Sequence, residues 1–290
     1  MSDESSSIWL FTAEEISNSP SRLAGIKSED EFNYRYLAAQ MIQDIGEKLS
    51  VFQLCTNTAI VYMHRFYMKQ SFHKFKYNTM SAACLFLAAK VEEQPRKIEH
   101  VAKVVYNFTH KDQKVPDARS QHEIQDIMEE ISCDEQILLQ TLGFTTIVEH
   151  PHTQIVTTCS LIRASKEISH SSYVFATTSL LLTTMCLQYK SPVISCVCIN
   201  VACKWSGYEV PKSAEGRYWF TYVDPSMTIE RLEELSKELS TAMERNPSKL
   251  FKMRKSLSHL KVCYTVLCYT VLCYTVLCYT VLCYTVFGIL

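Results

Sequence analysis

A helix of small and apolar residues that ends in lysine is encoded twice in this chain. Residues 79–91 carry almost no polar side chains, so a helix there is apolar on every side and must be buried. The segment that begins at Pro192 has the same character when Lys204 is aligned with Lys90. The matched positions are Ser81 with Ser195, Cys84 with Cys198, Ala88 with Ala202 and Ala89 with Cys203. We interpret this pattern as an internal duplication that places one buried helix in each half of the chain.

Helical signals also fill the rest of the chain. Three S/T-x-x-E/Q capping boxes predict helices that begin near residues 13, 29 and 51. Apolar residues at helical spacing, with proline and glycine as start and stop signals, predict the remaining helices. These lie at about 97–108, 122–142, 151–165, 172–188, 192–204 and 228–245. Strand-like alternation is absent from residues 8–260, so the prediction is an all-α chain of five helices followed by five, after a short N-terminal helix.

The length of 290 residues exceeds the usual size of one domain, which favours two. The duplication indicates where they divide. We predict an N-terminal helix and linker at 1–28, a first helical bundle at 29–148, a second at 149–250, a basic segment at 251–261 and an apolar tail at 262–290.

Composition excludes several classes of function. The net charge is −1, which provides no general attraction for nucleic acid. The chain has only six glycines and no phosphate-binding or catalytic motif, so we expect neither an enzyme nor a cofactor. No Cys-x-x-Cys pair occurs, most cysteines outside the tail sit in apolar helical patterns, and His150-Pro151-His152 is more typical of a helix start than of a metal site. No secretory signal opens the sequence, so we expect a cytosolic origin.

The tail repeats Cys-Tyr-Thr-Val-Leu without a charged residue. Its length would allow it to span a bilayer, but basic and aromatic flanks are lacking and a five-residue period builds no defined helical face. We interpret it as the translation of a short tandem nucleotide repeat or a misread end of a gene. If translated, its composition is that of an aggregation-prone strand former. A membrane anchor is the alternative.

Several specific runs of residues are spread over residues 8 to about 250. They are Phe11-Thr12-x-Glu14, Asn18-Ser19-Pro20-Ser21-Arg22, residues 57–68 (NTAIVYMHRFYM), residues 86–95 (FLAAKVEEQP), residues 139–144 (LQTLGF), His150-Pro151-His152-Thr153 and Ala202-Cys203-Lys204-Trp205. Together these runs resemble the cyclin T family. The resemblance implies a duplicated five-helix cyclin fold with two cyclin boxes, in agreement with the duplication.

The resemblance also implies a function. A chain of this family is expected to be a nuclear regulatory subunit that forms a heterodimer with a cyclin-dependent kinase of the positive transcription elongation factor b type. It would thereby promote phosphorylation of the C-terminal domain of RNA polymerase II and transcription elongation. A cyclin K or cyclin L type of transcription or splicing cyclin is the near alternative. A nucleic-acid-binding relative of general transcription factor B is the alternative of another class, although it should be strongly basic and carry a zinc ribbon.

Four residues are implied to meet the kinase. Lys90 and Glu135 would hydrogen-bond its backbone, Glu93 would add a polar contact, and Phe144 would be an apolar anchor. Without the resemblance, Lys90 and Glu93 mark a solvated helix end, Glu135 is a solvent-facing carboxylate, and Phe144 is a core residue.

A basic cluster lies where the family carries an RNA-responsive segment. It consists of Lys249, Lys252, Arg254 and Lys255. RNA or regulatory proteins are therefore hypothetical further partners, and a solvated helix end is the simpler interpretation.

The sequence departs from related families at two places. Cell-cycle cyclins carry a Met-Arg-x-x-Leu-x-x-x-Trp docking patch, whereas residues 34–38 read Tyr-Arg-Tyr-Leu-Ala and Met41 stands where the tryptophan would fall. This favours a transcriptional cyclin. Cyclin T chains usually continue into a long His-rich region, and the pentapeptide repeats stand in its place.

Overall fold

The computed structural model describes residues 8–110 and 118–246, and within them the regular structure is helical, without a strand. The chain forms two compact units. Of the described residues, the first contains 8–110, 118–149 and 179–190, and the second contains 150–178 and 191–246. Residues 179–190 belong to the first unit although they follow the start of the second. The sequence pattern did not predict this, because local periodicity does not say with which unit a segment packs.

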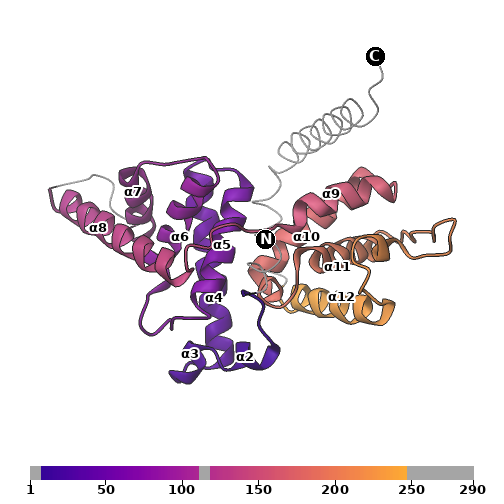
Figure 1. Ribbon diagram of the computed structural model, residues 1–290. Coiled ribbons are helices and arrows are strands. Elements are labelled where there is room, and N and C mark those ends of the chain that lie inside the picture. Colours follow the sequence, from indigo (N-terminus) through magenta and orange to yellow (C-terminus); the bar gives the residue numbers. More distant parts are fainter. Residues whose placement is uncertain (1–7, 111–117, 247–290) are drawn as a thin grey trace, which may run out of the picture. The chain divides into compact units, whose positions relative to one another are not determined.

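The described part of the first unit that precedes residue 150 contains two short helices and five longer ones (Figure 1). The short helices are α2 (Ala13–Ser17) and α3 (Pro20–Leu23), and the longer ones are α4 (Ser28–Lys48), α5 (Gln53–Phe66), α6 (Tyr77–Val91), α7 (Ile98–Thr109) and α8 (Ala118–Thr141). Helix α6 packs against α4, α5 and α8. Every residue from Met80 to Ala89 on it is buried, which confirms the prediction from its apolar composition.

Only the first of the three predicted capping boxes is confirmed in this unit. Thr12 accepts from the backbone N–H of Glu15, whose carboxylate accepts from the backbone N–H of Thr12. Ser28 is the first residue of α4, and the N-cap position falls on Lys27, so Ser28 does not cap the helix. Glu31, the other residue of the predicted box, forms an ion pair with Arg35. Ser50 has a φ of 52° and closes α4, and α5 begins after Phe52.

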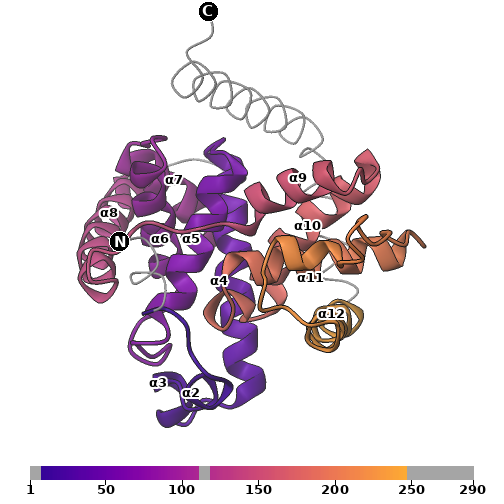
Figure 2. The same cartoon turned by 45° about the vertical axis from the view of Figure 1, so that its right-hand side comes forward.

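The second repeat differs in detail from the five predicted helices. Its elements are α9 (Pro151–Leu161), α10 (Lys166–Leu182), α11 (Ser191–Trp205), the 3₁₀ helix η2 (Trp219–Tyr222) and α12 (Ile229–Glu244), so a 3₁₀ turn takes the place of one predicted helix. Helix α11 lies between α9 and α12 (Figure 2). Residues Ile194–Ile199 of α11 are buried, as the duplication predicts.

The helix predicted over residues 172–188 is wrong at both ends. Helix α10 starts at Lys166 and stops at Leu182, and a separate 3₁₀ helix, η1, covers Met185–Leu187. The side chain of Thr183 explains the break. Its hydroxyl donates to the carbonyl of Ser179 and accepts from the N–H of Met185, so a side chain takes over backbone hydrogen bonds at that point.

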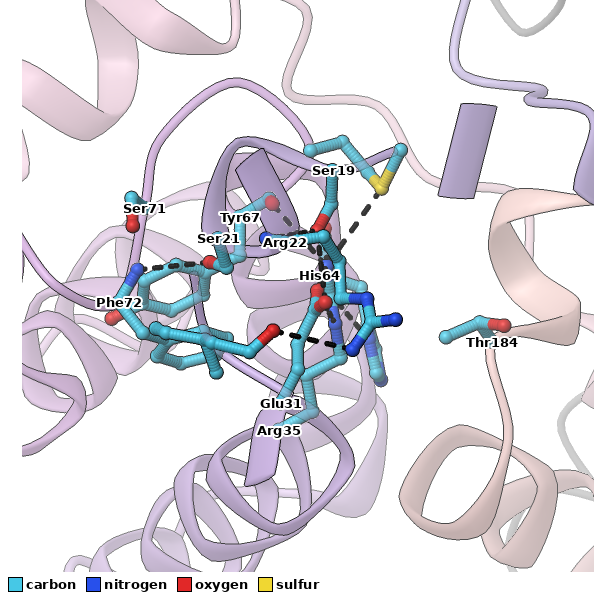
Figure 3. A network of polar contacts seen from close by, with 12 residues as sticks. Ser19, Ser21, Arg22, Glu31, Arg35, His64, Tyr67, Ser71, Phe72 and Thr184 are labelled. Carbon is cyan, nitrogen blue, oxygen red and sulfur yellow. Dashed lines mark hydrogen bonds and ion pairs between the residues drawn. The ribbon is translucent and has the colours of Figure 1, made fainter. Parts of the chain in front are cut away.

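A buried ionic network ties α3, α4 and α5 together in the first unit (Figure 3). Arg35 is 4% exposed and donates from Nε and NH2 to Glu31 Oε1 at 3.1 and 2.9 Å. It also donates to the carbonyls of His64 and Tyr67, each at 3.2 Å. The other oxygen of Glu31 accepts from the Ser19 hydroxyl at 2.8 Å. Both charges are therefore fully compensated, which is the condition for burying them.

The buried ion pair gives a stability prediction. Arg35→Met leaves the Glu31 carboxylate buried without a counter-charge, and we expect the free energy of unfolding to fall by about 3–5 kcal/mol. The double variant Glu31→Leu/Arg35→Met removes both charges and should recover most of that loss. Urea denaturation of the three proteins measures the difference. A double variant no more stable than Arg35→Met would contradict this account.

Burial of His64 gives a pH prediction. Burial, reinforced by the neighbouring Arg35, lowers the pKa of His64 to about 3. Its Nε2 lies 2.8 Å from the carbonyl of Leu180, so the neutral ring donates there. The unfolded chain takes up a proton near pH 6.5, whereas the folded chain does not, so stability is lost as the pH falls below that value.

We expect His64 to contribute a loss of about 1.4 kcal/mol per pH unit between roughly pH 6 and pH 5. His64→Gln removes this contribution and should show a correspondingly shallower acid slope in urea denaturation at several pH values. An unchanged slope would mean that the ring takes up a proton in the folded chain.

Candidate functional site

Lys90 lies where the buried helix α6 reaches the surface of the first unit. Its Nζ lies 2.8 Å from each carboxylate oxygen of Glu135 on α8. The ammonium group also lies 4.1 Å from the centre of the Phe86 ring, one turn earlier on α6. The Lys90 side chain is 46% exposed and that of Glu135 is 15% exposed. The structure therefore brings these two predicted residues together in an ion pair and leaves the lysine open to solvent.

The end of α6 has a strained backbone. The N–H of Glu92 donates to the carbonyl of Ala88 in the last helical hydrogen bond, and that of Gln94 donates to the carbonyl of Ala89 in the six-residue bond of a Schellman motif, both at 2.8 Å. The motif requires the residue between them, Glu93, to adopt a left-handed conformation with a φ of 54°. A residue other than glycine loses about 1–2 kcal/mol in this conformation.

The Glu93 side chain forms no contact within the described residues that would offset the free-energy cost of the left-handed backbone. It is exposed, and it forms no hydrogen bond or ion pair with the described residues. At the matched position of the second repeat, three residues after Lys204, the chain has Gly207 with a φ of 61°. The first repeat thus keeps a carboxylate where its duplicate uses the residue that fits best, and backbone strain of this kind is a feature of functional sites.

The residues beside Glu93 anchor the end of α6 to α5. The Thr58 hydroxyl donates to Glu92 Oε1 at 2.7 Å, and the backbone N–H of Phe52 donates to Gln94 Oε1 at 2.8 Å. Because the flanking residues are fixed, the carboxylate of Glu93 projects from a defined position.

Phe144 also lies on the surface of the first unit, not in its core. It is 69% exposed and has a φ of 58°, directly after Gly143 closes α8. The hydroxyl of Tyr62 on α5 donates to the carbonyl of Thr146, so the segment after α8 is bound to α5. The alternative interpretation of Phe144 as a core residue is wrong, because the turn directs it outward.

Two further exposed apolar residues belong to the same elements and were missed from the sequence. Phe52 is 65% exposed at the start of α5, and Ile147 is 80% exposed in the segment bound to Tyr62. Neither lies in a periodic pattern, so the sequence carried no signal for them. With Phe144 they are exposed apolar side chains of the first unit, and aromatic side chains of this kind are suited to a protein partner. We call Lys90, Glu93, Glu135, Phe144, Phe52 and Ile147 the α6-end surface.

The second repeat contains a similar ion pair. Lys204, at the end of α11, is paired with Glu233 on α12. Their side chains are 50% and 48% exposed. The duplication inferred from sequence therefore extends from the buried helix to the charged pair at its end.

The structure does not describe the remaining candidate residues. Lys249, Lys252, Arg254, Lys255 and the tail at 262–290 lie outside the described residues. Across residues 8–110 and 118–246, no cluster of three or more metal-ligating side chains is present. None of the helices in that part of the chain is both long and apolar enough to cross a membrane. Most of its cysteines are buried, but Cys133 is exposed on α8.

The stretch that corresponds to the docking patch of cell-cycle cyclins has its arginine withdrawn from the surface. Arg35 is fully engaged with Glu31 and backbone carbonyls. Tyr34 and Leu37 are partly exposed at 38% and 41%. The Arg35 guanidinium is therefore engaged within the chain and not presented at the surface.

Two family models match the chain. The family described as "Cyclin, N-terminal domain" matches residues 7–147, and the family described as "Cyclin-T2-like, C-terminal domain" matches residues 150–242. Mouse Cyclin-T1 is 50% identical over 246 residues, which cover 85% of this chain and 34% of that protein. Mouse Cyclin-T2 is 51% identical over 249 residues, which cover 86% of this chain and 34% of that protein.

A solved structure shows the same fold. A chain of the yeast RNA Pol II CTD kinase CTDK-1 complex superposes with a TM-score of 0.67 at 12% identity, covering 83% of this chain and 74% of that one. This chain spans about a third of the length of its curated relatives. Two adjoining cyclin domains and about 50% identity to cyclins T identify the chain as a member of the cyclin family, in its cyclin T branch.

Proposed function

We propose that this chain binds and activates a cyclin-dependent kinase catalytic subunit of the positive transcription elongation factor b type. It would act in the nucleus, as one subunit of a heterodimer, to promote phosphorylation of the RNA polymerase II C-terminal domain. The observation that carries the proposal is the Lys90–Glu135 pair with the strained, unbonded Glu93 beside it. Similarity to cyclins T1 and T2 supports it, and so does the shared fold with a chain of the yeast CTD kinase complex.

The chain would act by shifting a conformational equilibrium in the kinase. Catalysis by a protein kinase requires an ion pair between a lysine near the phosphates and a glutamate on the kinase C-helix. A partner that binds the aligned position of that helix more tightly than the displaced one raises the active population. Activation then needs a rigid surface at the right place, and none of this chain's residues has to touch the phosphate. The chain is accordingly a regulatory subunit.

The α6-end surface has the components for such binding. Lys90 keeps donor capacity beside Glu135, and the exposed Glu93 offers acceptor oxygens. Charge-assisted hydrogen bonds are directional, so they would set the register of the partner. Burying an exposed phenylalanine such as Phe144 contributes about 1.5–3 kcal/mol. Polar contacts would therefore orient the kinase, and apolar contacts would supply affinity.

The basic residues after residue 248 remain a separate part of the proposal. Lys249, Lys252, Arg254 and Lys255 would attract RNA or an acidic regulatory protein. The kinase-binding proposal is argued from residues of the first unit and does not depend on these basic residues.

Reversing the charges of the first ion pair tests the interface. We expect Lys90→Glu and Glu135→Lys each to weaken kinase binding by roughly tenfold to a hundredfold, the value of a hydrogen bond to a charged group. The double variant Lys90→Glu/Glu135→Lys restores an ion pair within the chain but presents it to the kinase with the wrong polarity. It should therefore remain defective in affinity capture and in kinase assays on a polymerase heptad peptide.

The second repeat provides the matched control. Lys204→Glu/Glu233→Lys reverses the equivalent pair on α11 and α12 and should leave kinase binding unchanged. If the first double variant binds like the wild type, the pair has only an intramolecular role. If no protein binds a kinase, the proposed function fails.

Glu93 allows function to be separated from stability. Glu93→Gly relieves the left-handed strain at the cost of a more flexible unfolded chain, so we expect stability to stay within about 1 kcal/mol of wild type or to rise. Kinase activation should nevertheless fall, because the only change at the surface is the loss of a carboxylate. Thermal unfolding and the peptide kinase assay on the same preparation measure both effects.

Arg163→Gly is the control for this experiment. Arg163 also has a left-handed backbone, with a φ of 52°, at the end of α9 in the second unit. It should change stability in the same direction without affecting activation. A Glu93→Gly protein with full kinase activation would remove Glu93 from the interface.

A further inference from the structure

An N-terminal segment lies against the end of α5 in the first unit. Trp9 lies in a turn, and Phe11 follows it in the irregular chain that leads into α2. The Arg65 guanidinium lies 5.4 Å from the centre of the Trp9 ring, and Lys69 Nζ lies 5.5 Å from the centre of the Phe11 ring. The N–H of Phe11 donates to the carbonyl of Leu187 at 2.7 Å. We call residues 8–12 the strap.

Arg65 is buried beneath the strap without an acceptor for two of its nitrogens. It is 7% exposed, and neither Nε nor NH1 has a hydrogen-bond partner within the described chain. Trp9 is 4% exposed, and its indole Nε1 is also buried without a partner. Two donor-only groups in contact with each other are thus both unsatisfied at one place, which is rare in folded proteins.

Among the described residues, none supplies a counter-charge to Arg65. The ionisable groups that interact with it are the Cys186 thiol and the Tyr62 phenol. Burial raises the pKa of Cys186 to about 12, so the thiol is neutral at physiological pH. Burial likewise lowers the pKa of Arg65 itself. The cation therefore faces neutral groups.

Arg35, in the same unit, is a buried arginine with a structural role, and its hydrogen bonding can be compared with that of Arg65. All three of its guanidinium nitrogens donate, to Glu31 and to backbone carbonyls (Figure 3). A structural role therefore does not explain why Arg65 lacks these acceptors. A buried cation without a counter-charge is costly to keep, and an anion is the partner that removes the cost.

We propose that Arg65, the indole N–H of Trp9 and Lys69 form a binding position for one oxyanion, a carboxylate or a phosphate group, between the strap and the end of α5. The oxyanion accepts the hydrogen bonds that the described chain leaves unmade, and the exposed Lys69 adds a second positive charge at the rim. The position is independent of the α6-end surface, so it stands whether or not the chain binds a kinase.

The tryptophans make the test direct. The chain has three, Trp9, Trp205 and Trp219, so indole ¹⁵N labelling of the full chain gives one N–H signal for each. The probes are inorganic phosphate, acetate, and sodium chloride at matched ionic strength. We expect the Trp9 signal to shift to saturation with phosphate or acetate and the other two to stay in place. A response to phosphate alone assigns a phosphate group, and a response to acetate alone assigns a carboxylate.

Three variants identify the residues. Arg65→Met should abolish the shift, and Lys69→Met should weaken the apparent affinity by roughly threefold, the effect of one exposed charge. Lys103→Met, which replaces an exposed lysine on α7, should match wild type. The proposal is overturned if no saturable Trp9 shift exceeds that in sodium chloride, or if the shift persists in Arg65→Met.

Thermal unfolding without phosphate provides a second readout. Arg65→Met removes an uncompensated buried charge and should raise the Tm, whereas Arg35→Met removes a compensated one and should lower it. A Tm for Arg65→Met that falls as it does for Arg35→Met would mean that Arg65 already has its partner in the folded chain, and would overturn the proposal.

Discussion

The complete burial of α6 determines how the first unit is organised. A helix without a polar face can be stable only if other helices cover it on every side, and α4, α5 and α8 do so. Its lysine cannot remain in that core, so Lys90 marks the point at which the helix emerges. The glutamate that meets it comes from α8, one of the covering helices. The position of the charged pair is therefore a consequence of the packing around α6.

Rigidity at this position comes from the way in which α6 ends. The Schellman motif places Glu93 between Glu92 and Gln94, and both neighbours are hydrogen-bonded to α5 or to the residue that precedes it. A left-handed glutamate is unfavourable by itself, but the fixed neighbours leave the backbone no alternative. The proposed activation of a kinase requires a rigid binding surface. The hydrogen bonds of Glu92 and Gln94 favour such rigidity at this end of α6.

The first unit also contains two buried arginines, Arg35 and Arg65, whose hydrogen bonding differs. Arg35 and Glu31 compensate each other and connect α3, α4 and α5 through Ser19 and the backbone. Arg65 on α5 has an aromatic ring above it, and its Nε and NH1 have no acceptor within the described residues. The low dielectric of the interior makes a satisfied network strong and an unsatisfied cation costly. The two arginines therefore contribute to stability with opposite sign, even though each is buried in the same unit.

Local patterns of residues were enough to establish the all-helical class, the duplication, the burial of α6 and α11 and the approximate helix positions, because these depend on local periodicity. Through the cyclin T motifs, the sequence also predicted Lys90, Glu93, Glu135 and Phe144 as kinase contacts, and this stays a prediction. It could not establish that Ser28 would cap nothing, since the Glu31 carboxylate is bonded to the distant Ser19 as well as to Arg35. It did not show that residues 179–190 join the first unit, or that two nitrogens of Arg65 lack acceptors within the described residues. Those outcomes belong to the tertiary structure, because they depend on which groups meet across distances in the chain that no local pattern records.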